Sequence, residues 1–249
     1  MPELPEVEVS RLGVEPNLVG RCIIQAVLRT PRLRHALTPE LAASLVGKRI
    51  DAVRRRGKYL LFDCESSHGG GWLILHLGMS GSLRLVPPGT PAQKHDHVDL
   101  VFAHTVLRLR DPRRFGTLVW QPGPDVEAHP LLAVQGIEPL SDAFDGDWLY
   151  AATRGRRTPI KPFLMDSHRI VGVGNIYAAE SLFRAGINPL REAGKVSRQR
   201  CAALADAVKD ILAHAITRGG TTLRDFISPD GAPGYFEQEL SVYGRGGEP

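Results

Sequence analysis

The chain has 249 residues, of which 43% are hydrophobic and 23% charged, with a formal net charge of +4. This composition is ordinary for a globular protein and excludes disorder as the default, and the length allows two compact domains or one large one. A modest basic surplus allows a nucleic-acid partner without requiring one.

The basic residues gather in three clusters. One such cluster is often only a solvated face, but three in one chain favour a polyanionic partner. The clusters are Arg54, Arg55, Arg56 and Lys58; Arg108, Arg110, Arg113 and Arg114; and Arg154, Arg156, Arg157 and Lys161.

Cysteine usage and the N-terminus predict a reduced, intracellular, soluble protein. Cys22, Cys64 and Cys201 are scattered and form no C-x-x-C pair, which argues against a disulfide framework or a zinc site. The N-terminal MPELPEVE is acidic and has no apolar core, so it is not a signal peptide. No apolar run approaches the ~18 residues that a membrane-spanning helix needs.

The first half of the chain is predicted to form a helix followed by strands. Acidic residues in the first turn and Gly20 as a stop predict a helix over residues 6–18. Short β-rich runs separated by Gly, Pro and Asp turns then favour a β-sandwich or barrel. These runs are residues 59–62, 72–77, 98–102, 106–109 and 117–120.

The second half is predicted to be helical. Residues 121–139 are rich in Pro and Gly without periodicity, which predicts a linker or domain boundary. The clearest helix spans residues 197–218, where apolar positions recur at i, i+3, i+4 and i+7 and Gly219 follows as the stop. The tail from residue 221 is Gly/Pro-rich, and no internal repeat is found.

The N-terminus carries a candidate nucleophile. Once Met1 is removed, Pro2 presents a secondary amine, and an α-amino group titrates near roughly 7.7–8.0 against about 10.4 for lysine. Glu3 is a carboxylate available for acid–base work, and Glu6 lies about one turn further on. By itself the segment fits a plain helix start better than a nucleophile.

Four further motifs indicate DNA chemistry only in combination. Lys58 lies between a glycine and a strand, and Met79 lies in a Gly/Ser-rich turn. DPRRFG places arginines beside Phe115, which suits insertion into a duplex where a base has left the stack. Gly172 and Gly174 precede Asn175, a predicted N-cap of a helix ending at Ala185, and bare glycine backbone there predicts a site for DNA phosphate.

Together these segments resemble the bacterial formamidopyrimidine-DNA glycosylases over essentially the whole chain. The matching motifs, in order, are PELPEVE, RGKYLLF, HLGMSGSLR, KHDHVDL, DPRRFG, IKPFLMD, VGVGNIYAAESLFRAGI, GGTTLRDF and GYFEQELSVYGR. The resemblance implies an α+β fold in which a β-sandwich with a leading helix, residues 1–130, precedes a helix–two-turns–helix domain, residues 131–222. Residues 223–249 would hold the lesion-loop region and the start of a zinc finger.

The resemblance also implies residue roles. Pro2 would be the Schiff-base nucleophile, Glu3 the general acid/base, Glu6 a supporting carboxylate and Lys58 the catalytic, phosphate-contacting lysine. Met79, Arg113 and Phe115 would fill the vacated duplex position. His95, Arg113 and Arg156 match DNA-binding positions, Lys161 and Asn175 match phosphate contacts, and residues 221–235 match the loop that closes over an everted 8-oxoguanine.

The implied activity is base excision repair by a bifunctional glycosylase/AP lyase that removes oxidised purines from duplex DNA. Two alternatives stay open: a non-catalytic damage-recognition module, and the pyrimidine-preferring endonuclease VIII subfamily. That subfamily has glycine in place of Leu4 and lacks this oxopurine loop, so the purine branch is favoured. A monomer in the bacterial cytoplasm, associated with the nucleoid and not with membrane, is expected.

The family continues after GRGGEP with a four-cysteine zinc finger that carries an arginine near the lesion, so the zinc cysteines would follow Pro249. The three cysteines of this chain lie elsewhere, and a structural site needs four ligands. We therefore expect no metal or other cofactor in this chain and one structural zinc in the full-length protein. Without the finger, DNA affinity should fall and the second elimination lacks that arginine.

Overall fold

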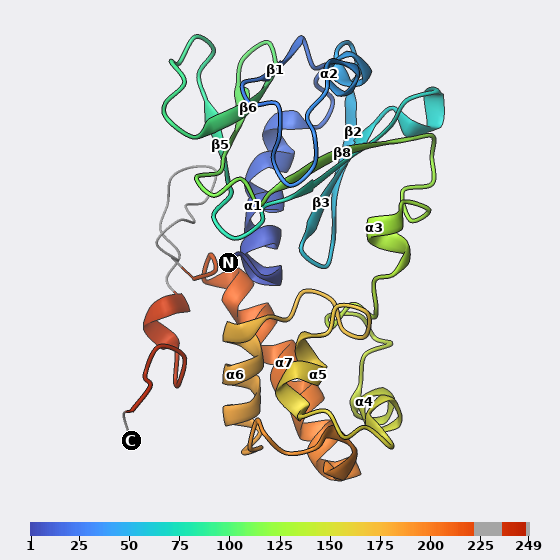
Figure 1. Ribbon diagram of the computed structural model, residues 1–249, viewed down its shortest axis with the longest axis vertical. Coiled ribbons are helices and arrows are strands. Elements are labelled where there is room, and N and C mark those ends of the chain that lie inside the picture. The colour runs from blue at the N-terminus through green and yellow to red at the C-terminus, as the bar shows by residue number, and fades with distance from the viewer. Residues whose placement is uncertain (222–235, 248–249) are drawn as a thin grey trace.

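A computed structural model describes residues 1–221 and 236–247, so most of the segment matched to the lesion loop lies outside the described residues. The N-terminal part contains two four-stranded antiparallel sheets that face each other across one core (Figure 1). This confirms the predicted β-sandwich. One sheet has the order β1 (Gln25–Leu28), β6 (Asp96–Val101), β7 (Val106–Arg110) and β5 (Ser82–Val86). The other has the order β2 (Ile50–Arg56), β3 (Tyr59–Cys64), β4 (Gly71–His76) and β8 (Thr117–Pro122).

The five strand predictions are confirmed to within two residues at each end. The strands β1, β2 and β5 and the helix α2 (Pro39–Leu45) were not predicted. The strand β2 ends in Arg54, Arg55 and Arg56, so its second half shows no apolar alternation. Ion pairs of Arg55 hold this half instead. Its pairing with β3 along the whole of Tyr59–Cys64 makes it a strand despite that composition.

The leading helix α1 (Leu4–Leu18) belongs to both halves of the molecule. It begins two residues earlier than predicted, because the Glu3 side chain and the Glu6 side chain form a capping box. Val7 and Val14 pack into the sandwich core, whereas Leu4 packs into the core of the helical domain. Its first turn therefore lies at the junction between the two halves, where the N-terminus is seen in Figure 1.

Residues 121–139, predicted as a linker or domain boundary, are partly packed against the second sheet. Val126 and Leu132, the latter in α3 (Pro130–Ala133), are buried against Trp72 and Ile74. These two belong to β4, so the segment covers the outer face of the second sheet. Burial of apolar side chains thus fixes a stretch that carries no periodic pattern.

The second half is helical, as predicted. It contains α4 (Gly146–Thr153), α5 (Ile160–Met165), α6 (Asn175–Arg184) and α7 (Arg198–Thr217). The predicted apolar stripe of α7 is buried, and Ser197 caps the helix by accepting a hydrogen bond from the Arg200 amide. Three single-turn helices complete the described elements: η1 (Ser66–His68), η2 (Ala193–Lys195) and η3 (Phe236–Glu239). Among residues 1–221 and 236–247, no helix is long and apolar enough to cross a membrane.

Candidate active site and nucleic-acid interface

The N-terminal residues are held against the helical domain through glycine backbone. The Leu4 amide donates to the Gly172 carbonyl at 3.0 Å, and Pro2 is buried. A Cβ at Gly172 would lie 2.6 Å from Leu4 Cδ1, and the residue has a φ of +81°. Both facts require glycine at this position. The close contact between Leu4 and Gly172 places Pro2 and Glu3 between the two domains.

Glu3 occupies the N-terminus of α6. Its buried carboxylate accepts hydrogen bonds from the amides of Gly174 at 2.7 Å and Ile176 at 3.0 Å. The anion bound by the Gly174 and Ile176 amides is therefore the protein's own carboxylate. These two amides are not free for a DNA phosphate, and the contact of Asn175 with a phosphate stays a prediction. Asn175 is not the N-cap: Gly174 takes that position, and Asn175 is the exposed first residue of the helix.

Glu6 is the centre of a second buried group. Its carboxylate accepts from the Glu3 amide at 2.8 Å, from Tyr177 Oη at 2.6 Å and from both the amide and the hydroxyl of Thr221 at 2.9 Å. Burial and the neighbouring Glu6 hold the pKa of Tyr177 well above its usual value, so its hydroxyl stays a donor. Glu6 thus ties the first turn of α1 to α6 and to the residues that follow α7.

Lys58 lies beside Glu3. A Cβ at Gly174 would be 2.5 Å from Glu3 Oε1 and 2.7 Å from Lys58 Nζ, so the two side chains converge on one small space. Burial raises the pKa of Glu3 despite the opposing charge of Lys58, and burial lowers the pKa of Lys58. An acid and an amine whose ordinary pKa values are moved toward neutrality are suited to proton transfer.

A cavity of about 220 Å³ opens beside this pair and is lined by Met1, Lys58, Tyr59 and His76 among others. His76 was missed by the sequence reasoning, although it stands in HLGMSGSL directly before the predicted turn. Burial, and then the charges of Lys58 and Arg34, lower its pKa to about 4. The His76 ring is therefore neutral, and its Nδ1 accepts from the Gly78 amide at 2.9 Å.

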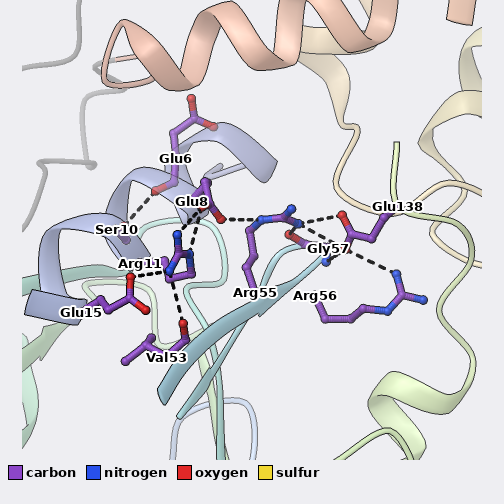
Figure 2. Close-up of polar contacts among 10 residues, drawn as sticks. All are labelled: Glu6, Glu8, Ser10, Arg11, Glu15, Val53, Arg55, Arg56, Gly57 and Glu138. Carbon is purple, nitrogen blue, oxygen red and sulfur yellow. Dashed lines mark hydrogen bonds and ion pairs between the residues drawn. The ribbon is translucent and has the colours of Figure 1, made fainter. Parts of the chain in front are cut away.

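An ion network fixes the turn that carries Lys58 (Figure 2). Arg55 bridges Glu8 of α1 at 2.9 Å and Glu138 at 3.0 Å. Glu138 also accepts from the Gly57 amide at 2.6 Å, and Arg56 donates to the Gly136 carbonyl at 2.6 Å. Two arginines of the first basic cluster therefore join α1, β2 and the segment between the domains, and are not free for a polyanion.

The other two basic clusters are also partly internal. Arg108 is buried, pairs with Asp99 at 2.8 Å and donates to two backbone carbonyls. Arg154 donates to the carbonyls of Gly194 and Val196. The prediction of three polyanion-binding clusters is thus too broad: Arg113, Arg114, Arg156 and Arg157 are the exposed members of these two clusters.

The residues matched to the duplex wedge lie on two adjoining turns. Met79 is 41% exposed between β4 and β5, and Phe115 is 46% exposed between β7 and β8. The Arg113 guanidinium lies over the Phe115 ring, 4.9 Å from its centroid. His95 is half-buried with a φ of +77°, and Lys161 lies in the first turn of α5.

The residues that the structure describes do not fit a zinc site. Cys22 is exposed while Cys64 and Cys201 are buried in the two different cores. Within the part of the chain that the structure describes, no three His, Cys, Asp or Glu side chains gather as metal ligands. Pro249, after which the resemblance places the zinc cysteines, lies outside the described residues. A zinc finger beyond it therefore stays a prediction.

The fold and this junction define a class: two-domain α+β proteins whose N-terminus lies between a β-sandwich and a helical domain. The model of the formamidopyrimidine-DNA glycosylase N-terminal domain matches residues 1–118, and the model of its H2TH domain matches residues 135–227. The chain belongs to the formamidopyrimidine-DNA glycosylase family of DNA-repair enzymes.

Named relatives and solved structures agree. Formamidopyrimidine-DNA glycosylase of Stenotrophomonas maltophilia (strain R551-3) is 63% identical over 100% of this chain and 90% of the relative. MutM (Fpg) of Thermus thermophilus is 40% identical, with a TM-score of 0.86 over 98% of this chain and 88% of that chain. Wild-type Lactococcus lactis Fpg (MutM), in complex with N7-benzyl-Fapy-dG-containing DNA, is 36% identical with a TM-score of 0.89 over the same shares.

Proposed function

We propose that this protein excises oxidised purines, 8-oxoguanine and formamidopyrimidines, from duplex DNA and then cleaves the strand as an AP lyase. The observation that carries the proposal is the buried convergence of Glu3 and Lys58 beside the N-terminus, at the junction of the two domains. Relatives named for formamidopyrimidine excision and a solved relative bound to Fapy-dG-type DNA support the substrate class.

In the proposed reaction the Pro2 amine attacks C1′ as the bond from C1′ to the base breaks. Glu3, whose raised pKa keeps it available as an acid, donates the proton that lets the sugar open or the base depart. A secondary amine gives a permanently cationic iminium, which acidifies the C2′ hydrogen. Removal of that proton expels the 3′ phosphate by β-elimination, and a second, δ-elimination expels the 5′ phosphate.

The nucleophile requires removal of Met1. In the unprocessed chain the Pro2 nitrogen is a tertiary amide and has no lone pair available for attack. Met1 itself lines the cavity beside Lys58. Release of Met1 would therefore both free the amine and enlarge the space into which C1′ must come.

The DNA contacts are proposed as follows. Met79, Arg113 and Phe115 fill the space left by the everted base, and Lys58, Lys161 and Asn175 contact phosphates, with His95 and Arg156 as further contacts. We propose domains over residues 1–130, 131–222 and 223–249, and a monomer acting on nucleoid DNA in the bacterial cytoplasm. The structural zinc of the full-length protein, held by cysteines after Pro249, is likewise a proposal.

Borohydride reduction with duplex DNA containing 8-oxoguanine opposite cytosine tests the proposal. Processed wild-type protein should form a covalent adduct, and the same protein with Met1 retained should form none, because its Pro2 nitrogen is an amide and cannot attack C1′. Equal trapping by both proteins, or none by the wild type, would contradict the assignment of Pro2. Faster excision of thymine glycol than of 8-oxoguanine would instead favour the pyrimidine-preferring alternative.

A further inference from the structure

We propose that Asp111 is a positioning residue that holds two turns in one rigid arrangement before DNA arrives. These turns, here called the wedge turns, carry Met79 and Phe115. The inference rests on the proposed function, because it assumes that Met79, Arg113 and Phe115 enter the duplex. Asp111 follows β7 directly and is completely buried, while Arg113, Arg114 and Phe115 after it are exposed. A buried carboxylate so close to three exposed residues needs a physical reason.

The two oxygens of the Asp111 carboxylate bind different turns. Oδ1 accepts from the Ser80 hydroxyl at 2.8 Å, next to Met79. Oδ2 accepts from the Gly116 amide at 2.8 Å, next to Phe115. One side chain therefore links the turn that carries Met79 to the turn that carries Phe115.

The Asp111 main chain also binds the segment that carries His95, a proposed DNA contact. Its amide donates to the His95 carbonyl at 3.0 Å, and its carbonyl accepts from the Arg114 amide at 3.2 Å. The same carbonyl lies 3.0 Å from His97 Nε2. His95, with its φ of +77°, is thus held at the same point as the two wedge turns.

The packing around the carboxylate leaves no slack. A Cβ at Gly78 would lie 2.5 Å from the Phe115 carbonyl carbon, so the backbones of the two turns are in direct contact. A Cβ at Gly116 would lie 3.0 Å from Asp111 Oδ2. The wedge side chains consequently project from backbone that is already ordered, which lowers the conformational entropy lost on binding.

The chemistry requires a group that accepts twice. Ser80 Oγ already accepts from the Arg113 amide at 3.1 Å, so its own proton must go to Asp111. In Asp111→Asn an NH2 donor replaces one of the two accepting oxygens. Either the Gly116 amide or the Ser80 hydroxyl then loses its acceptor, with almost no change in side-chain volume.

The test compares two reactions of Asp111→Asn. Excision of 8-oxoguanine from duplex DNA, measured under single-turnover conditions, should fall about 10-fold to 100-fold because misplaced positioning groups carry costs of this size. Strand cleavage of a single-stranded oligonucleotide with a preformed abasic site should stay within about twofold of wild type, since no duplex has to be opened. Asp145→Asn, which removes the carboxylate that caps α4 at Trp148, is the matched control and should change neither reaction.

A double-mutant cycle adds a second readout. If Asp111 acts through the wedge, adding Asp111→Asn to Phe115→Ala should slow excision by no more than about twofold relative to Phe115→Ala alone. Additive losses would overturn the inference. Ser80→Ala, which breaks one arm of the link, should show the same split between the two reactions if Asp111→Asn does not fold.

The outcomes separate the inference from the function. The positioning role would be overturned if Asp111→Asn excised from duplex DNA at the wild-type rate. It would also be overturned if Asp111→Asn and Ser80→Ala each lost both reactions equally. Neither result would contradict the glycosylase activity. A wild-type protein that neither excises 8-oxoguanine nor cleaves the abasic oligonucleotide would instead overturn the proposed function.

Discussion

At the scale of single residues, the site depends on a carboxylate that is buried and yet ligated by peptide amides. Glu3 is stabilised by the N-terminus of α6, while burial raises its pKa. The amides orient the carboxylate, and the burial keeps a proton within its reach at a higher pH than a free glutamate allows. This balance supports the proposed role of Glu3 as a positioned acid.

Glu3→Gln should reduce base excision by about 10² to 10⁴, the usual size of a lost general acid–base group. The glutamine keeps one oxygen for the amides of α6 but has no proton to give. Single-turnover excision of 8-oxoguanine measures the effect. Glu40→Gln, an exposed carboxylate at the start of α2, is the control and should leave the rate unchanged. A Glu3→Gln protein with wild-type excision would exclude Glu3 as the acid.

His76 predicts a pH dependence of stability. Its pKa is lowered to about 4, so between about pH 4 and the unfolded value near 6.5 the unfolded chain binds a proton that the folded protein does not. Stability contributed by the neutral ring is complete above that window and is lost as the pH falls through it, by up to about 3 kcal/mol. Urea unfolding of wild type and His76→Gln at pH 5 and pH 7 measures this. An identical pH dependence in both proteins would contradict a His76 ring that is neutral in the folded protein.

At the scale of elements, the site depends on the alignment of α1, the β2–β3 turn and the segment between the domains. Arg55 contacts Glu8 and Glu138, and Glu138 holds the Gly57 amide beside Lys58 (Figure 2). The elements that carry Glu3 and Lys58 are thereby locked to each other. Gly57 itself has a φ of +56°, and a Cβ there would lie 2.9 Å from Val171 Cβ, so the turn also requires glycine.

Glu138→Ala should lower the free energy of unfolding by about 2–3 kcal/mol, because it removes one of the two carboxylates of Arg55 and leaves the Gly57 amide without its acceptor. The matched control is Glu127→Ala. Glu127 is 57% exposed and lies 3.9 Å from Arg56, so its removal should cost at most about 1 kcal/mol. Denaturant unfolding measures the free energy of unfolding of both variants. An equal decrease in the two would show that the network does not stabilise the junction.

Elements were predictable where composition and periodicity agreed. The apolar stripe of α7 and the glycine that ends it predicted that helix to within a residue at each end. β2 and the packed segment around Val126 were missed for the opposite reason, since their structure comes from partners far away in the sequence. Ion pairs and sheet neighbours leave no local pattern.

At the scale of the whole molecule, the number of basic residues overstates the positive surface available to DNA. Internal carboxylates and carbonyls bind the guanidinium groups of Arg55, Arg108 and Arg154. The exposed positive charge is therefore concentrated on fewer residues, among them Arg113 and Arg156. Phosphate neutralisation by this smaller set should govern affinity and its dependence on salt.

Arg156→Ala and Lys161→Ala should each reduce the slope of log affinity against log salt concentration by about 1, uniformly for damaged and undamaged duplexes. Titration of fluorescent duplex DNA at several salt concentrations measures the slope. Arg49→Ala is the control, because Arg49 is paired with Asp51 at 2.8 Å and should leave the slope unchanged. An unchanged slope in both test variants would exclude these residues as phosphate contacts.

The site as a whole was predictable in its residue types but not in its connections. The N-terminal motif made Pro2, Glu3 and Glu6 candidates, and the resemblance implied their roles and that of Lys58. The structure places Glu3, Glu6 and Lys58 around one junction. The bond from the Ile176 amide to Glu3 joins residues 173 positions apart, and the bond from Ser80 to Asp111 spans 31 positions. Such contacts follow from packing of distant segments, which a single sequence does not display.

The central claim is that the Pro2 nitrogen becomes bonded to the deoxyribose. Borohydride-reduced protein, after reaction with duplex DNA containing 8-oxoguanine, should be digested and its N-terminal peptide sequenced by mass spectrometry. The peptide should begin at Pro2 and carry the reduced sugar remnant on the Pro2 nitrogen. A remnant on Lys58, or on a peptide that still begins with Met1, would contradict the account.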